Sequence, residues 1–282
     1  MKIDIICPLY NAENYILSLN KSLMMQKNVN INKIRYVLTK SNDNTKYIMD
    51  KNKIEYKLIN KNDFSHSLTR EKEAFSSNSD ILVFITQDIV IEDDLWLYNL
   101  VHDIQNGICV AAYSRQISKY NNLEKYTREF NYPNKSKIMS KKDISKFGLK
   151  TFFFSDASSA IKRDIFIKLN GYDNKNLPIS EDMYIAYKII MNNYKIKYES
   201  KSIVYHSHKF TLKELYDRYK LTGKFFKDNA YLDNYGTNRS GFNMAIYILK
   251  RSLKEFNIRV LIYFPINMLV RYFAMKKGKS GD

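Results

Sequence analysis

The segment Ile81–Asp94, ILVFITQDIVIEDD, begins as a nearly unbroken apolar run and changes character at Thr86, Gln87 and Asp88. A short, continuous apolar run is typical of a strand that is buried on both faces, as in a parallel sheet covered by helices. Asp88 therefore stands where such a strand ends. Because open α/β sheets bind ligands beyond the carboxyl ends of their strands, this carboxylate is a candidate ligand-binding group.

Similar apolar runs alternate with helix-length stretches over residues 1–115. The predicted strands are residues 3–7, 34–39, 56–59, 81–86 and 108–113. This alternation predicts an α/β fold with a mainly parallel sheet flanked by helices. Polar residues that follow the first, second and fourth runs should then meet at one edge of the sheet. No glycine-rich phosphate loop follows the first run, which argues against a dinucleotide or P-loop site.

The composition limits the class of partner. The chain has 282 residues, and its 46 Lys and Arg against 29 Asp and Glu give a net charge of +17. This charge favours an anionic partner such as nucleic acid, phospholipid or a phosphorylated substrate. Cys7 and Cys109 lie in separate apolar runs, which predicts buried free thiols in a reducing compartment. The opening MKIDIICPLYN interrupts its apolar run too early for a signal peptide, so we expect a cytoplasmic protein.

Two interpretations are open for Asp88. A carboxylate at the end of a strand can hold a hard divalent cation through oxygen. Alternatively, Asp88 only ends the strand, and Glu92, Asp93 and Asp94 form the acidic first turn of the next helix. The residues alone favour the helix-start interpretation for the last three acids.

A second acidic pair occurs in NLPISEDMYIAYKIIMNNY, residues 176–194. Ser180 is a predicted N-cap, with Glu181 and Asp182 in the first turn of an amphipathic helix. A carboxylate at the mouth of a loop can also accept a proton from a substrate hydroxyl. The residues alone favour capping and leave general-base catalysis as the alternative.

Six motifs in one order carry a family resemblance. They are ICPLYNAENYI, FSHSLTRE from Phe64, LVFITQD, FFSDASSAIKRDIF from Phe153, ISEDMYIAYKI from Ile179 and VYHSHKFTLKELYDRYKLTGKFF from Val204. Together they resemble family 2 glycosyltransferases, and within that family the bacterial rhamnosyltransferase-like branch. The resemblance implies a GT-A (Rossmann-like) catalytic domain, which we place at residues 1–210. A basic, amphipathic helical segment is expected at residues 211–282.

The resemblance assigns donor-binding roles to residues after the predicted strands and in FSHSLTRE. The nucleobase and ribose side would be held near the first and second strands, and the phosphates and sugar by His66, Arg70 and Asp156. A guanidinium suits phosphate because it can donate two parallel hydrogen bonds. The donor-binding residues implied in this way are Pro8, Tyr10, Asn11, Ser41, Asp43, His66, Arg70, Gln87, Asp88 and Asp156.

The resemblance also implies a divalent metal ion. Asp88 corresponds to the last acid of an Asp-x-Asp metal motif, and Thr86 replaces the first acid. Mg²⁺ or Mn²⁺ would be held by Asp88 with diphosphate oxygens and with His206, His208 or both. Two residues apart on an extended segment, the two histidines should face the same way. A histidine that merely ends its strand is the alternative for one of them.

The reaction implied is an inverting transfer of a sugar from a nucleoside diphosphate, with dTDP-rhamnose favoured and a UDP-sugar as the alternative. Asp182 would be the general base, Glu181 would orient the acceptor, and the acceptor would be a saccharide or a lipid-linked saccharide.

Two other classes of function remain open. The charge and the 23 tyrosines suit nucleic-acid binding, although no such motif is found, and the missing acid suits an inactive scaffold.

The carboxyl-terminal segment is apolar and basic together. Its longest uncharged run, residues 260–270, includes Pro265 and is far shorter than the roughly 20 residues that cross a bilayer, so we expect no membrane span. Such a segment can lie on the anionic inner face of the cell membrane. A helical hairpin packed on the catalytic domain, or a homodimer contact, is the alternative.

Overall fold

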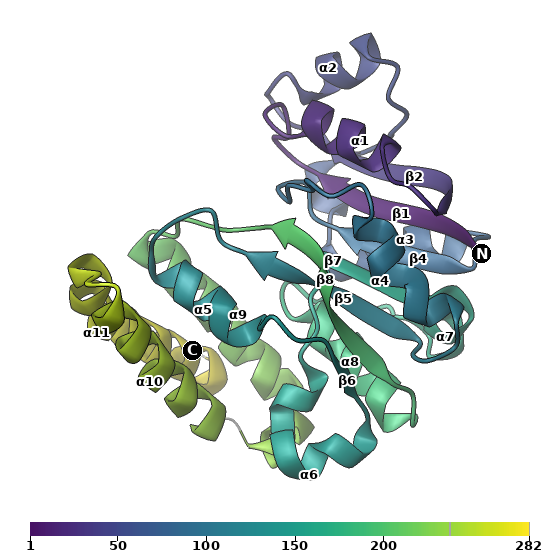
Figure 1. Cartoon of the computed structure of the whole chain (residues 1–282). Helices are drawn as coiled ribbons and strands as arrows, with labels where there is room; N and C mark the ends of the chain where they lie inside the picture. The colour runs from purple at the N-terminus through teal and green to yellow at the C-terminus, as the bar shows by residue number, and fades with distance from the viewer. Residues whose placement is uncertain (237, 282) are drawn as a thin grey trace.

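The computed structural model describes residues 1–236 and 238–281. Within them, eight strands form one sheet in the order β3-β2-β1-β4-β7-β5-β8-β6 (Figure 1). The strands are β1 (Lys2–Leu9), β2 (Asn30–Thr39), β3 (Lys57–Ile59), β4 (Ile81–Ile85), β5 (Ala111–Ile117), β6 (Lys137–Met139), β7 (Ser158–Lys162) and β8 (Ile196–Tyr205).

Strand direction brings the predicted ligand-binding residues to one edge. Strands β1 to β4 are mutually parallel, β5 is parallel to β8, and β6 is antiparallel to β8. Strand β7 is antiparallel to both of its neighbours, so β4 and β5 run in the same direction. The carboxyl ends of β1, β2, β4, β5 and β8 therefore share an edge with the start of β7. The predicted α/β fold with a mainly parallel sheet is confirmed.

Strand β4 explains the apolar run of the opening segment. Ile81, Val83 and Ile85 belong to one hydrophobic core, while Leu82 and Phe84 belong to the core on the opposite face. Successive side chains of a strand point to opposite faces, so a strand covered on both sides must be apolar at every position. The apolar run can end only where the strand extends beyond the helices that cover it. Asp88 follows at that point.

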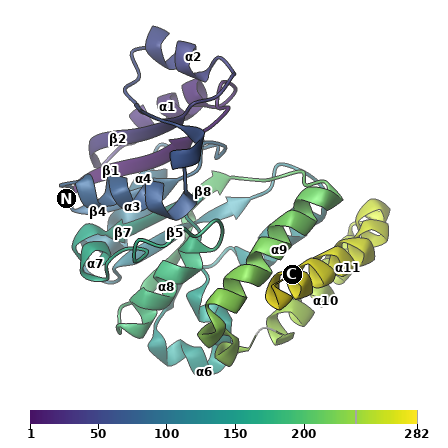
Figure 2. The same ribbon diagram turned by 180° about the vertical axis from the view of Figure 1, so that it is seen from behind.

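Helices cover both faces of the sheet (Figures 1 and 2). Helices α1, α2 and α4 contribute to one core, and α3, α7, α8 and α9 to the other. A third, smaller core joins α5, α10 and α11. The helices are α1 (Ile16–Met24), α2 (Thr45–Lys51), α3 (His66–Ser76), α4 (Trp96–Gln105), α5 (Leu123–Asn131), α6 (Ile144–Phe147), α7 (Arg163–Lys168), α8 (Glu181–Met191), α9 (Leu212–Asp228), α10 (Asn238–Lys254) and α11 (Ile258–Ser280).

The fifth predicted strand, residues 108–113, is wrong at its start. The Gly107 N–H donates to the Ile104 carbonyl oxygen, and the Ile108 N–H donates to that of Asp103. With Gly107 at a φ of 72°, this is the Schellman ending of α4, which satisfies the last helix carbonyls. Ile108 is therefore part of the helix ending, and β5 begins only at Ala111.

The carboxyl-terminal helices α9, α10 and α11 stand together at the side of the sheet away from α1 and α2 (Figures 1 and 2). Two glycines let α9 and α11 approach closely. A methyl group on Gly223 would collide with the carbonyl oxygen of Met275, and one on Gly278 with that of Lys220.

Helix α11 continues through Pro265 for 23 residues and is long and apolar enough to cross a membrane. This corrects the sequence argument against a span, which counted only the uncharged run. Length and composition alone do not establish a span, because the core helix of a soluble protein can meet the same test.

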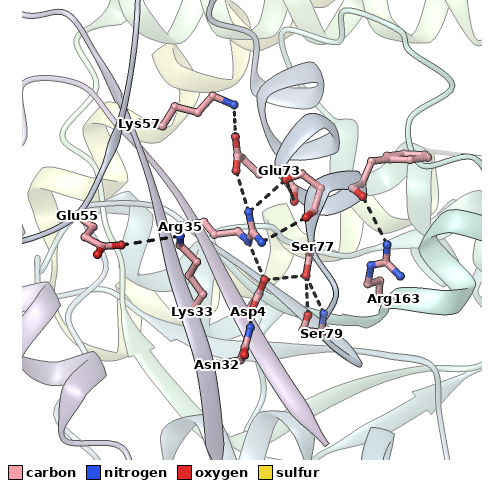
Figure 3. Close-up of polar contacts among 12 residues, drawn as sticks. Asp4, Asn32, Lys33, Arg35, Glu55, Lys57, Glu73, Ser77, Ser79 and Arg163 are labelled. Carbon is pink, nitrogen blue, oxygen red and sulfur yellow. Dashed lines mark hydrogen bonds and ion pairs between the residues drawn. The ribbon is translucent and has the colours of Figure 1, made fainter.

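A polar cluster braces the start of β1 against β2 and α3 (Figure 3). The Asp4 carboxylate is fully buried and accepts hydrogen bonds at 2.7 Å from Asn32, Arg35 and Ser77. Desolvation opposes its ionisation, but these hydrogen bonds outweigh desolvation and lower the pKa of Asp4. The Asp4 cluster thus satisfies itself within the fold.

Candidate active site

Two chain segments far apart in sequence bring Asp88 to His206. Beyond β4, Val90 pairs with Tyr205 at the end of β8 through two backbone hydrogen bonds of 2.9 Å. The next N–H, that of His206, donates to the Ile117 carbonyl oxygen at the end of β5. The carboxyl ends of β4, β5 and β8 are thereby tied together, and Asp88 and His206 meet at the shared edge.

Asp88, His206 and His208 form the Asp88 cluster. Asp88 Oδ2 lies 3.4 Å from His206 Nε2 and 3.7 Å from His208 Nδ1, and the three ligand atoms all lie within 4.8 Å of one another. The two imidazoles contact edge to face with centroids 4.5 Å apart, so the prediction that both face the same way is met. Burial and the charge of His206 lower the pKa of His208 to about 4, which keeps its imidazole neutral at pH 7.

Gln116, which sequence reasoning missed, sets the orientation of His206. Its Oε1 lies 2.9 Å from His206 Nδ1 and also accepts a hydrogen bond from Arg128. Arginine can only donate, so the Gln116 atom facing it must be the oxygen. His206 Nδ1 then donates a hydrogen bond to that oxygen, and Nε2 faces Asp88. A hydrogen bond on the far nitrogen is how proteins orient metal-binding histidines.

The second acidic pair lies in a buried charge cluster at the start of α8. Glu181 Oε1 accepts from Arg70 Nη1 at 3.0 Å, and the Asp182 side chain beside it is half-buried. Desolvation and the negative charges of Glu181 and Asp156 raise the pKa of Asp182 well above its usual range. A carboxylate whose pKa is moved toward neutrality in this way suits proton transfer.

Arg70 and Asp156 differ from the roles that the resemblance implied. The Arg70 side chain is only 3% exposed and is committed to Glu181 and to the His66 carbonyl oxygen. Asp156 is buried and accepts hydrogen bonds from Ser159 and Tyr172 at 2.7 and 2.8 Å. Asp156 is thus engaged inside the protein, and Arg70 holds Glu181 through Nη1, while its buried Nε has no hydrogen-bond partner among the described residues.

The capping interpretations of the acids also need correction. Ser180 occupies the N-cap of α8 with a φ of 62°, and its side chain makes no capping hydrogen bond. Glu181 is held by Arg70, whereas Asp182 Oδ1 accepts from the Met183 N–H at 2.7 Å in the first turn of α8, so the helix-start interpretation applies to Asp182 but not to Glu181. Ahead of α4, Asp93 accepts from the Leu95 N–H and Asp94 pairs with Lys27, and both acids precede the helix.

The donor side predicted from the first two strands comes together as expected from their parallel pairing. The Tyr10 N–H donates to Gln87 Oε1 at 2.7 Å, and Gln87 Nε2 returns a bond to the Tyr10 carbonyl oxygen at 2.8 Å. Next to them, Asp43 accepts from Ser41 at 2.6 Å and from the Glu13 N–H at 3.1 Å. Asn11 takes a left-handed φ of 50° in this turn, and Pro8 pairs with Val37 inside the sheet.

An exposed cation borders this site. Arg218 of α9 lies 5.7 Å from the Phe210 ring centroid, and Phe210 packs against His208 at 4.9 Å. The charge of Arg218 also partly offsets the raised pKa of Asp182, and it acts on the exposed His66. Arg218 is therefore stacked beside the Asp88 cluster through Phe210, and its charge acts on Asp182. Its helix belongs to the predicted carboxyl-terminal segment, so local patterning provided no signal for it.

The residues at the sheet edge fit a divalent metal ion. One carboxylate and two imidazoles converge within the reach of a single ion, and three protein ligands leave coordination positions for other oxygens. The predicted motif residue Thr86 contributes no acid, but the two histidines supply donors in its place.

Residues 4–169 match the family described as glycosyl transferase family 2. The chain belongs to this family. It is 33% identical over 251 residues to the O-antigen chain rhamnosyltransferase RfbN of Salmonella typhimurium, a match that covers 87% of this chain and 79% of RfbN. It is 32% identical over 210 residues to the O-antigen chain rhamnosyltransferase WbaN of Salmonella anatum, covering 73% of this chain and 66% of WbaN. The protein is therefore a glycosyltransferase.

Solved structures share the fold of this family 2 enzyme. The mannosyltransferase PcManGT from Pyrobaculum calidifontis, in complex with GDP-Man and Mn²⁺, has a TM-score of 0.63 at 13% identity, covering 98% of this chain and 85% of that one. Residues 1–349 of S. aureus TarS, in complex with UDP-GlcNAc, give 0.59 at 16% identity over 90% of this chain and 73% of that one. At these identities the likeness concerns the fold alone.

Proposed function

We propose that this glycosyltransferase transfers L-rhamnose from dTDP-rhamnose to a saccharide or lipid-linked saccharide in surface polysaccharide synthesis. A UDP-linked sugar is the alternative donor. One observation carries the proposal: Asp88, His206 and His208 converge at the ligand-binding edge of the sheet, and the exposed Arg218 is stacked over Phe210 beside His208. The names of the relatives RfbN and WbaN support the choice of sugar.

Asp88, His206 and His208 would hold a Mg²⁺ or Mn²⁺ ion together with donor diphosphate oxygens. When bound, such an ion neutralises the negative charge that develops on the departing diphosphate. The solved complex of PcManGT with GDP-Man and Mn²⁺ supports this choice of cofactor. Gln116 accepts a hydrogen bond from His206 Nδ1 and so orients Nε2, the other ring nitrogen, toward Asp88.

Asp182 accepts the proton of the acceptor hydroxyl. As that oxygen bonds to the anomeric carbon, the bond from this carbon to the diphosphate oxygen breaks, which gives inversion in one displacement. Glu181 is anchored by Arg70, and its negative charge helps to raise the pKa of Asp182. A base is most effective when its pKa lies near the working pH.

Arg218 takes over the phosphate-binding role that the resemblance gave to Arg70. Arg70 is buried and already paired, whereas Arg218 is exposed and stacked over Phe210 beside His208. An exposed guanidinium beside the Asp88 cluster can donate to diphosphate oxygens and stabilise charge on the leaving group. The nucleobase and ribose would lie between the turns that follow β1 and β2, against Tyr10, Asn11, Ser41 and Asp43.

The reaction would take place on the cytoplasmic side of the membrane, since the free buried thiols Cys7 and Cys109 suit a reducing compartment. The first test is a thermal-shift panel of dTDP, UDP, GDP and their sugar conjugates, each with Mg²⁺, Mn²⁺ or EDTA. A ligand at about 100 times its Kd should stabilise the protein by roughly 2.7 kcal/mol. We expect a metal-dependent shift with a dTDP-sugar, whereas no shift with any nucleotide would contradict the proposal.

The base assignment has its own test. Asp182→Asn should keep the donor-induced shift and lose transfer by about 10²–10⁴-fold, because only proton removal is affected. Unchanged turnover in this variant would exclude Asp182 as the base. Binding of random DNA without any effect of nucleotide sugars would instead support the nucleic-acid class.

A further inference from the structure

Helix α11 is apolar on both its inner and its outer face. Its inner residues Val260, Phe264 and Ala274 are buried against neighbouring helices. Its outer apolar residues recur every three or four positions and are all exposed, with Ile262 at 67%: they are Ile258, Ile262, Ile266, Leu269, Tyr272 and Phe273. A helix that is apolar all round is normally covered on every side, so the outer face requires a partner.

Helix α10 extends this apolar face. Phe242, Leu249 and Leu253 are exposed along α10, and Phe256 in the turn to α11 is 88% exposed. The two helices lie side by side on the outside of the molecule (Figures 1 and 2). Together these exposed side chains form one surface, here called the α10–α11 face.

The charge around the α10–α11 face is of one sign. Residues 238–281 contain nine Lys or Arg and a single acid, Glu255, which pairs with Lys125 and Arg251. Exposed cations border the apolar residues at Lys250, Lys254, Arg259 and Lys276. A symmetric contact between two copies would bring these like charges together, whereas an anionic lipid surface would neutralise them.

The packing of α11 determines how it can meet a membrane. The close glycine crossing at Gly223 and Gly278 holds its inner face on α9, so only the outer face is free. A helix held in this way lies along the lipid–water interface, with its apolar side chains inserted and its cations at the headgroups. Tyr272 and Phe273, followed by Lys276, have the order of residues found at that interface.

A cleft lies between His208 of the Asp88 cluster and helix α11. It has a volume of about 320 Å³ and is lined by His208 and Phe210 on one side and by Arg259, Asn267 and Arg271 of α11 on the other. Arg271 Nε is buried and has no hydrogen-bond partner among the described residues. Glu124 also lines the cleft, but Arg128 neutralises it at 2.8 Å.

We propose that the α10–α11 face docks the enzyme on an anionic lipid surface and that the cleft beside it admits a lipid-linked acceptor to the Asp88 cluster. This inference rests on the proposed function for the acceptor, but the docking itself does not. Arg259 and Arg271 would lie at the level of the lipid phosphates, where a guanidinium donates to phosphate oxygens.

The test is co-sedimentation of the full chain with vesicles of phosphatidylcholine alone or with about one third phosphatidylglycerol. We expect binding to the anionic vesicles only, weakened by salt because surface charges are screened. The double variant Ile262→Asp, Leu269→Asp should lose binding at least about tenfold, since it places two charges where apolar side chains insert. The matched control is Leu17→Asp, Met24→Asp on α1, two equally exposed apolar positions, which should bind like the wild type.

Three results would contradict docking on an anionic lipid surface. Absence of vesicle binding, or equal loss in both double variants, would contradict it. A wild-type dimer in sedimentation that only Ile262→Asp, Leu269→Asp dissociates would assign the face to a second copy of the chain. The dTDP-sugar thermal shift, measured on the same samples, reports the proposed function separately and should be unchanged in both double variants.

The cleft has its own test. Arg271→Gln should slow transfer to a vesicle-bound acceptor several-fold more than transfer to a soluble saccharide, and equal slowing would exclude the cleft as the route.

Discussion

The Asp4 cluster and the Asp88 cluster lie on neighbouring strands of one sheet and differ in what they leave unsatisfied. Asp4, near the start of β1, accepts three hydrogen bonds of 2.7 Å and is fully buried (Figure 3). Asp88, beyond the end of β4, is 24% exposed and lies 3.4 and 3.7 Å from two histidines, beyond ordinary hydrogen-bond lengths. Burial of a carboxylate therefore does not by itself mark a functional site. A functional site is indicated where several polar groups converge and are not fully hydrogen-bonded to one another.

The largest effect should come from Asp88→Asn. We expect transfer to fall by at least about 10³-fold, because the amide would remove the one negative ligand of the proposed metal site. Thermal stability should change little, since the carboxylate makes only long contacts. Steady-state kcat/KM and Tm measured together provide the test. Asp94→Asn, which breaks an exposed pair with Lys27, is the matched control and should retain activity.

Asp4→Ala should show the opposite behaviour. Removing Asp4 leaves Arg35 with its longer ion pair to Glu73 at 3.4 Å and leaves Asn32 and Ser77 without this acceptor; breaking a buried ion pair typically costs about 3–5 kcal/mol in the free energy of unfolding. Urea denaturation checks this value. The exposed pair of Lys46 and Asp50 supplies the control, because Asp50→Ala should lower the free energy of unfolding far less than Asp4→Ala does. If Asp4→Ala reduced kcat of the folded protein, the distinction between the two clusters would fail.

Gln116 allows a finer test of the Asp88 cluster. Gln116→Leu should weaken Mn²⁺ affinity by about 10–100-fold, because His206 Nδ1 loses the acceptor that orients the ring. Gln116→Glu keeps an oxygen for both His206 and Arg128 and should restore most of the affinity. Isothermal titration with Mn²⁺, in the absence of donor, measures the effect without relying on activity. Equal loss in both variants would argue for a purely structural role.

The smallest effects should appear in the pH dependence. The pKa of Asp182 is raised, so kcat/KM should increase with pH as the base loses its proton. Glu181→Gln should move this rising part of the pH profile to lower pH, because it removes a negative charge that raises the pKa of Asp182.

The pKa of Asp4 is lowered, so the contribution of Asp4 to stability is present above its unfolded pKa and is lost as pH falls through the folded value. Urea titrations at several pH values test the pH dependence of stability. Profiles of kcat/KM against pH test the prediction for Asp182, and an unshifted profile in Glu181→Gln would refute it.

Much of the fold could be predicted because its signals are local. Side-chain period and run length placed the first, third and fourth strands within two residues of their observed ends and missed the first four residues of β2, and a buried strand must turn polar where its cover ends. The fifth strand was misplaced because Ile108 is apolar yet serves the ending of α4 through a hydrogen bond to Asp103. Apolar character alone does not indicate whether a backbone N–H donates to a neighbouring strand or to the end of a helix.

The sequence by itself determined that acids and histidines would gather at the carboxyl edge of the sheet, since alternating strands and helices impose that edge. Only the tertiary structure decided which of these groups are engaged. Arg70 and Arg218 are both arginines on helices, yet one is sealed against Glu181 and the other is exposed beside His208. The partner of a polar group comes from segments distant along the chain, so its free or satisfied state is a property of packing rather than of local pattern.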